Sequence, residues 1–204
     1  MRSSRRRRMT LPQRRGQIVR EAMDLFARHG FAGTTTQKIA QRAGVSEALL
    51  FRIFRNKRSL YSAIIDLKIS ETGEDLFPHE AAARNDDQAV FNTIATVMLA
   101  SMERDPSFMR LMLYSGLERH QLAEMVYEAR VVKLFSFLEG YIRKRIRQKA
   151  FRPVRADVVA RTFVGMSVYH MLNSKIFGYQ ASRHLDIEQV AESFVDLTLQ
   201  GLKR

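Results

Sequence analysis

The stretch TTTQKIAQRAGVSEALLFRIFRNK, from Thr34 to Lys57, decides the fold of this chain. It begins with three hydroxyl residues, and a hydroxyl at the start of a helix accepts a hydrogen bond from a free backbone N–H group. Apolar residues then recur at helical spacing, namely Ile39, Ala40 and Ala43. Gly44 suits the left-handed turn that ends many helices, and Ser46 offers a second N-cap. A second helix follows, with Leu50 and Phe54 on one face. Two short helices around a glycine turn are the helix-turn-helix pattern, whose second helix enters the major groove of DNA.

An ordinary helical corner in a bundle has the same spacing, and the charge distribution decides between the two interpretations. Residues 1–60 hold 15 Lys or Arg residues against three acids, a net charge of +12. The remaining 144 residues hold 19 against 18, a net charge of +1. A charge that served only solubility would be spread over the surface. A surplus confined to the helix pair and the segment before it indicates a surface that binds a polyanion.

Residues from about Arg14 to Ile65 resemble the TetR family of bacterial one-component transcription regulators. The landmarks stand at fixed spacing: His29-Gly30-Phe31, Gly33-Thr34-Thr35, Ile39-Ala40, Ala43-Gly44-Val45-Ser46, Leu50-Phe51, Phe54, Lys57 and Leu60. The resemblance implies an all-α fold with a three-helix helix-turn-helix DNA-binding domain at the N-terminus. It also implies a larger C-terminal helical bundle for ligand binding and dimerisation, with about nine helices in all. Beyond about residue 70 the resemblance is one of layout.

We expect three regions along the chain: a disordered basic arm at 1–13, the DNA-binding domain at 14–57, and the regulatory and dimerisation domain at 58–204. The arm is rich in arginine and too poor in apolar residues to fold alone. Attached to a DNA-binding unit, such an arm suits binding along phosphates or insertion of an arginine into the minor groove.

Helical periodicity places the first helix at 14–29 and the connecting helix at 58–77. Residues 78–86 break the pattern and predict a loop. Further helices are expected over 87–102, 107–116, 120–149, 158–177 and 186–202. The last turns of the long helix at 120–149, YIRKRIRQK, are basic. Cations suit the C-terminal end of a helix dipole, which the sequence alone favours over a second nucleic-acid site.

The resemblance assigns phosphate or base contacts to most positions around the second helix of the pair. We expect DNA contacts from Thr34, Thr35, Thr36, Ser46, Glu47, Ala48, Leu49, Phe51, Arg52 and Lys57. Two of these differ from the family pattern. Phe51 stands where the family usually has Tyr, so a phosphate hydrogen bond is lost. Leu49 replaces a commonly polar residue and offers only apolar contact, for example to a thymine methyl group. Arg52 is the expected guanine reader, Lys57 the expected phosphate contact, and Glu47 suits a cytosine amino group or points outward.

Methionine is frequent in the C-terminal part of the chain. The simplest explanation is that Met fills an irregular helical core, whereas the resemblance implies an effector pocket there. For such a pocket we expect Met98, Met102, Met112, Phe135, Phe163, Met166 and Tyr169, a lining that suits a small, mostly apolar effector.

The helix expected at 158–177 is apolar around most of its circumference, which predicts burial on more than one side. In a chain of this size the second side is expected to face a partner subunit. The expected dimer contacts are Val158, Thr162, Gly165, Phe194 and Leu197, in a four-helix seam of the kind that the resembling family uses.

Several classes of protein do not fit the composition. Cysteine is absent and the five His residues are scattered, so neither a disulfide nor a metal site is expected. No catalytic or nucleotide-binding motif is present, and we expect neither an enzyme nor a cofactor. No run of about 18 apolar residues predicts a membrane span, and no apolar segment follows the arginines at the N-terminus as in a signal peptide. We therefore expect a cytoplasmic protein.

The sequence thus predicts a homodimeric, ligand-responsive repressor that reads a palindromic operator in double-stranded DNA. Binding of a small apolar effector to the C-terminal domain is expected to release it. The alternative is a basic protein that binds nucleic acid without regard to sequence, which shares the charge but has no use for a large neutral body.

Overall fold

The computed structural model describes residues 9–72, 76–118, 124–125, 127–179 and 185–203. These residues form ten α-helices and two short π-helical segments, so the fold is all-α as predicted, with one helix more than the nine or so expected. The chain divides into two compact units. Unit 1 comprises Met1–Lys68 and Arg110–Ala123, and unit 2 comprises Ile69–Met109 and Glu124–Arg204.

Unit 1 is built on the predicted helix pair. Its helices are α1 (Leu11–His29), α2 (Thr36–Arg42), α3 (Glu47–Ile53), most of α4 (Lys57–Thr72) and most of α7 (Ser107–Leu117). The fully buried side chains from these helices are Ile18, Phe26, Ile39, Leu50, Leu60, Tyr61 and Ile64. Unit 1 is therefore larger than the predicted domain at 14–57, because it includes the first turns of α4 and a helix from far along the chain.

The first helix begins earlier than predicted. The Thr10 hydroxyl accepts from the Gln13 backbone N–H, and the Gln13 side chain accepts from the Thr10 backbone N–H, which together form a capping box. Pro12 lies in the first turn, where its missing N–H group costs nothing. Residues 11–13 are consequently helical and not part of a disordered arm. The arginines at positions 2 and 5–8 lie outside the described residues.

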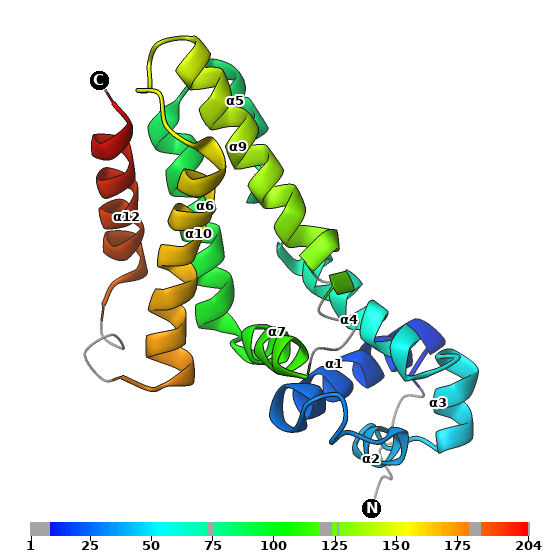
Figure 1. Cartoon of the computed structure of the whole chain (residues 1–204). Coiled ribbons are helices and arrows are strands. Elements are labelled where there is room, and N and C mark those ends of the chain that lie inside the picture. Colours follow the sequence, from blue (N-terminus) through cyan, green and yellow to red (C-terminus); the bar gives the residue numbers. More distant parts are fainter. Residues whose placement is uncertain (1–8, 73–75, 119–123, 126, 180–184, 204) are drawn as a thin grey trace, which may run out of the picture. The chain divides into compact units, whose positions relative to one another are not determined.

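Unit 2 is a helical bundle. Its helices are α5 (His79–Arg84), α6 (Asp87–Arg104), α9 (Val132–Arg147), α10 (Ala156–Met171) and α12 (Ile187–Leu202). α6 packs against α10 and α12, and α9 packs against α10 (Figure 1). The core includes Phe91 and Phe163, whose rings meet edge to face with centroids 4.9 Å apart.

Two expectations for the body were wrong. Residues 78–86 contain α5 instead of a loop, since the sequence HEAAAR between Pro78 and Asn85 consists mostly of good helix formers. Asn85 ends this helix in the left-handed conformation at φ 60°. The helix predicted over 120–149 is not uniformly α-helical, because Tyr127–Val131 forms a π-helical segment before α9.

The ends of two other helices lie closer to their predicted positions. The connecting helix α4 is described only to Thr72, short of the predicted end at 77. α10 continues into a π-helical segment over Leu172–Ile176, which matches the predicted end near 177. Among the helices that the structure describes, none combines the length and the hydrophobicity needed to cross a membrane.

Candidate nucleic-acid interface

The turn between α2 and α3 forms as the sequence predicts. The Thr35 hydroxyl caps α2 by accepting from the Lys38 backbone N–H at 3.2 Å, and the Ser46 hydroxyl caps α3 by accepting from the Leu49 N–H at 3.2 Å. Gly44 adopts φ 62°, a conformation that residues with a Cβ rarely take. These local signals fix the angle at which α3 leaves the turn.

α3 has a buried face and an exposed face. Leu50 is fully buried, and Phe54, just past the end of the helix, is 3% exposed. On the other face the side chains of Glu47, Ala48, Phe51 and Arg52 are exposed, with Leu49 and Ile53 half-buried at its edges. α3 therefore presents to solvent most of the side chains expected to contact DNA, together with Thr35 and Ser46.

A hydrogen bond across the helix pair orients the one acid on this face. The Thr36 hydroxyl at the start of α2 donates to Glu47 Oε1 at 2.5 Å. Glu47 also lies in the first turn of α3, where a negative charge suits the helix dipole. The carboxylate is thus held in place with acceptor capacity left over, a feature that sequence spacing did not reveal.

Two of the predicted contact residues are engaged inside unit 1. Thr34 is 1% exposed, and its hydroxyl donates to the carbonyl oxygens of Leu25 and Gly30, so it fastens the end of α1 and does not lie on the surface. Lys57 is half-buried, with its ammonium 3.8 Å from the centroid of the Phe31 ring and donating to the Phe31 carbonyl oxygen. Burial lowers the pKa of Lys57, and the nearby Glu118 carboxylate acts in the opposite direction.

Several cations of unit 1 remain on its surface. Arg42 is neutralised by Glu21 and Asp24, which lie on α1. The cations exposed elsewhere on the described part of this unit include Arg15, Arg20, Lys38, Arg52 and Arg55. With only Glu47 as an acid on the outer face of α3, this surface attracts a polyanion.

Three polar contacts join α7 and the residue that follows it to α4, to α1 and to the loop after α1. The hydroxyls of Tyr61 and Ser115 share a buried hydrogen bond of 2.5 Å, and the Tyr114 hydroxyl donates to the Arg28 carbonyl oxygen at 3.3 Å. Glu118, just after α7, accepts from the Phe31 backbone N–H at 3.1 Å. These partners lie 54 to 87 residues apart in sequence, so no local pattern predicts them.

Substitution Tyr61→Phe is expected to lower the free energy of unfolding by about 1–3 kcal/mol, because it leaves the buried Ser115 hydroxyl without its partner. Chemical denaturation measures the loss. Tyr114→Phe removes an exposed hydrogen bond that likewise joins residues far apart in sequence, and it is expected to lower the free energy of unfolding by less. If both variants lost the same free energy of unfolding, the buried hydrogen bond would not contribute more to stability than the exposed one.

Alkaline pH provides a second test of the same hydroxyl. Burial raises the pKa of Tyr61 to about 12 from an ordinary value near 10, so the unfolded chain releases this proton first. Stability from this group is complete below pH 10 and is lost as the pH rises toward 12. We expect the free energy of unfolding of the Tyr61→Phe variant to decrease less over this pH range, as measured by unfolding experiments at a series of pH values. A decrease as steep as in the unsubstituted protein would show that Tyr61 is not the group responsible.

The residues predicted to line an effector pocket belong to both units. Met112 belongs to unit 1, and the other six belong to unit 2. Met98 and Phe163 are buried in the core of unit 2, against which Met102, Phe135 and Met166 pack half-buried. Tyr169, on α10, is 67% exposed.

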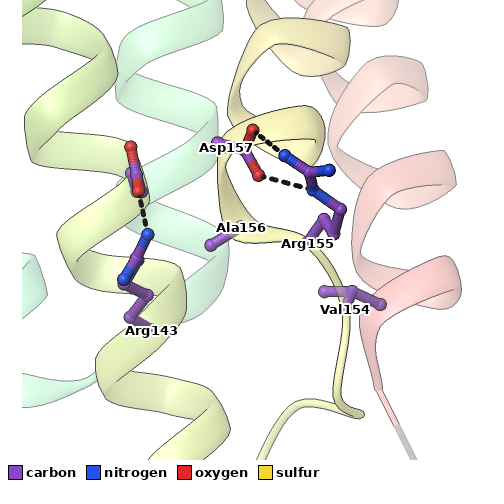
Figure 2. Close-up of a pocket in the computed structure, with 6 residues that line it drawn as sticks. Arg143, Val154, Arg155, Ala156 and Asp157 are labelled. Atoms are coloured by element: carbon purple, nitrogen blue, oxygen red, sulfur yellow. Dashed lines mark hydrogen bonds and ion pairs between the residues drawn. The ribbon is translucent and has the colours of Figure 1, made fainter.

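The structure does show a hollow in unit 2, of about 470 Å³, and none of the predicted pocket residues borders it. It is lined by Glu139, Arg143, Val154, Arg155, Ala156 and Asp157. Figure 2 shows Arg155 paired with Asp157, with Nη2 and Oδ2 2.9 Å apart. The hydrogen bonds from Arg155 lower the pKa of Asp157 to about 2, and Arg161 acts in the same direction. Because its charges are already paired, this open hollow does not resemble a site for an apolar effector.

The predicted dimer contacts lie at the surface of unit 2. On α10, Val158 is 44% exposed, and Thr162 and Gly165 are exposed on the same face. On α12, Leu197 is 66% exposed and Phe194 is half-buried. α10 and α12 therefore leave an apolar face open to solvent.

Comparison with known proteins matches the N-terminal helices to a family. Residues 18–64 match the model of the bacterial regulatory proteins of the tetR family. Over 165 residues the chain is 26% identical to the nucleoid occlusion factor SlmA of Aliivibrio fischeri, covering 76% of this chain and 80% of that protein.

Solved structures share the fold over nearly the whole chain. The TetR family transcriptional regulator PfmR from Thermus thermophilus superimposes with a TM-score of 0.70 at 22% identity, covering 92% of this chain and 99% of PfmR. AibR, solved in complex with isovaleryl coenzyme A and operator DNA, gives a TM-score of 0.65 at 23% identity, covering 90% of this chain and 97% of AibR. Residues 18–64 therefore carry the helix-turn-helix of the tetR family, and the chain as a whole has the fold of TetR-family transcriptional regulators.

Proposed function

We propose that this protein is a homodimeric repressor that reads a palindromic operator and leaves it when a small, mostly apolar molecule binds unit 2. The observation that carries the proposal is the exposed face of α3, where Glu47, Phe51 and Arg52 point to solvent while Leu50 is fully buried. A surface that served only to attract phosphate has no need of a fixed carboxylate. A carboxylate and a guanidinium group exposed on one helix suit reading of base edges.

Dimerisation is supported by the open apolar face of α10 and α12. Large exposed apolar side chains on a soluble helical surface mark an interaction site, and a two-fold axis lets the same face serve both subunits. In the dimer, two copies of α3 would read half-sites about one helical turn of DNA apart. Sedimentation of the purified protein tests this, and a monomer at micromolar concentration would refute it.

The composition of the core of unit 2 supports an effector. The core of unit 2 is rich in methionine and aromatic side chains, which adapt to apolar ligands. AibR was solved with an acyl coenzyme A thioester and operator DNA, so this fold accommodates a molecule with an apolar acyl chain. The effector would lower the affinity for DNA by the difference in its own affinity for the two states of the protein.

Selection of bound sequences from a random DNA pool tests the function. A palindromic consensus with two half-sites about one turn apart is the expected result. Equal affinity for the selected and the random duplexes would instead favour a protein that binds nucleic acid without regard to sequence, because phosphate contacts alone carry no sequence information.

Arg52→Ala is expected to weaken binding to the selected operator by about 1–3 kcal/mol, roughly 5- to 150-fold, because a bidentate contact to guanine is lost. A repeat of the selection should show relaxed preference at one position of each half-site. Arg28→Ala is the matched control, since it removes the same charge from unit 1 at a side chain that is paired with Asp24. A uniform loss across all sequences would assign Arg52 to phosphate and not to a base.

A further inference from the structure

One end of unit 2 gathers the cations of a unit that is neutral as a whole. In the sequence, the segments of unit 2 hold 16 Lys or Arg residues and 16 Asp or Glu residues. Seven of the cations lie between Arg143 and Arg155, and no acid occurs from Gly140 to Ala156. The charges of this unit are therefore segregated and not merely balanced.

The fold brings further cations to the same end. The last turn of α9, the loop before α10 and the end of α12 meet there (Figure 1). Phe151 and Lys203 form an antiparallel bridge, and the Arg152 backbone N–H donates to the Leu202 carbonyl oxygen at 2.9 Å. We define the basic end by its exposed cations, which are Arg143, Arg147, Lys149, Arg152, Arg155 and Lys203.

Internal pairing does not neutralise the basic end. Two neighbouring cations, Lys144 and Arg145, are used inside unit 2 and are not counted in it. Of the six exposed cations, Arg143 pairs with Glu139, and Arg155 pairs with Asp157 (Figure 2). Six cations against these two acids leave four positive charges.

The unpaired cations are not explained by the α9 dipole alone. Arg147 and Lys149 have no ion pair with any residue that the structure describes. A helix dipole favours cations within its last turn, which accounts for Arg147 at the end of α9. Lys203 suits the end of α12 in the same way. Lys149 and Arg152 lie beyond the last turn of α9, so a different reason is needed for their position at this end.

We propose that the basic end is a second surface for duplex DNA, which it binds through phosphates without reading bases. Arginine and lysine are the side chains that bind phosphate, and four of the six cations are arginines. Between Lys133 and Asp157 no large hydrophobic side chain is exposed. Protein interfaces centre on buried aromatic anchors, and helices that lie on membranes carry an apolar face, so a bare cationic surface fits a polyanion better than either.

This surface adds to the proposed function and rests on it in one respect, namely that unit 1 already holds the protein on DNA. A tethered surface meets nearby duplex at a high effective concentration, so even weak phosphate binding is used. The protein would then bridge two DNA segments, one read by α3 and one held at the basic end.

A capture assay with two duplexes tests the bridge. The full-length protein is bound to an immobilised duplex of selected sequence, and a fluorescent duplex of unrelated sequence is added at about 50 mM salt. The variant Arg147→Gln with Lys149→Asn removes two of the four cations that have no acidic partner among the described residues. Gln favours helix at the end of α9, and Asn accepts the φ of 60° at position 149. We expect the variant to capture the second duplex at least about tenfold more weakly. The slope of the logarithm of its affinity against the logarithm of the salt concentration should be shallower by about 1.8, or about 0.9 for each cation removed.

The matched control is Arg104→Gln with Lys133→Gln, which removes two exposed cations from the same unit, at the end of α6 and the start of α9, away from the basic end. It is expected to capture as the unsubstituted protein does. Equal capture by both double variants would overturn the proposal, and so would capture of vesicles containing anionic lipid, or of an acidic peptide, in preference to DNA. If the random pool yields no consensus, the proposed function fails, and the same comparison on an immobilised random duplex still tests the basic end.

Discussion

Binding of this protein to its selected DNA is expected to weaken by roughly three to five orders of magnitude between about 50 and 200 mM salt. Each phosphate that a protein neutralises releases condensed counterions, so the logarithm of affinity falls by about 0.9 per contact for each tenfold rise in salt. Residues 1–60 of each chain carry a net charge of +12, and the exposed cations of unit 1 include Lys38, Arg52 and Arg55 near the helix pair. In the proposed dimer, two such units would supply the six to ten phosphate contacts that this loss requires.

Fluorescence anisotropy at a series of salt concentrations measures the slope of the logarithm of affinity against the logarithm of the salt concentration. Arg55→Gln is expected to make the slope shallower by about 0.9 for each contact that it removes, while the selected consensus stays the same. Arg28→Gln, which removes the same charge at an arginine paired with Asp24, is expected to leave the slope unchanged. Affinity that stays flat between the two salt concentrations would exclude unit 1 as the phosphate-binding surface.

The parts of the fold that were predictable from sequence are those with local causes. The capping hydroxyls at Thr35 and Ser46, the left-handed Gly44, and the burial of Leu50 and Phe54 follow from side-chain chemistry within a few residues. The same holds for α6 and α12, whose predicted starts coincide with caps at Asp86 and Asp186. Loop signals from Pro78 and Asn85 misled the prediction at α5, because the helix formers between them fill about one and a half turns.

The features that escaped prediction depend on distant partners. Thr34 and Lys57 were assigned to DNA by position in a motif, yet each is engaged by backbone carbonyl oxygens of unit 1. The Glu118 contact with Phe31 spans 87 residues. Pocket residues were predicted from composition and from the family resemblance, and composition does not say which side of a helix faces inward, so the set includes both the buried Phe163 and the exposed Tyr169.

The largest effect on stability is expected at a charged cluster inside unit 2. The Asp87 carboxylate accepts from Arg145 Nε at 2.8 Å and Nη2 at 2.9 Å, and from the Tyr141 hydroxyl at 2.5 Å. The two charged side chains are only 13% and 15% exposed. This cluster ties the start of α6 to the last turns of α9, and the Arg145 guanidinium also lies 5.7 Å from the centroid of the Phe151 ring. Hydrogen bonding to Asp87 raises the pKa of Arg145. Without Asp87 the guanidinium still stays charged at neutral pH, because arginine is not deprotonated in proteins.

Asp87→Ala should therefore leave a buried guanidinium without a counterion and lower the free energy of unfolding by about 3–5 kcal/mol. Urea denaturation followed by circular dichroism measures the loss. The double variant Asp87→Ala with Arg145→Met removes both charges and is expected to recover part of the stability, because the cost comes from the charge left behind more than from the attraction that is lost. Glu80→Ala breaks the exposed pair with Arg84, whose side chains are 93% and 66% exposed, and should change stability by less than about 1 kcal/mol. If Asp87→Ala were no more harmful than Glu80→Ala, or if the double variant were less stable than Asp87→Ala, the cluster would not act as a buried ion pair.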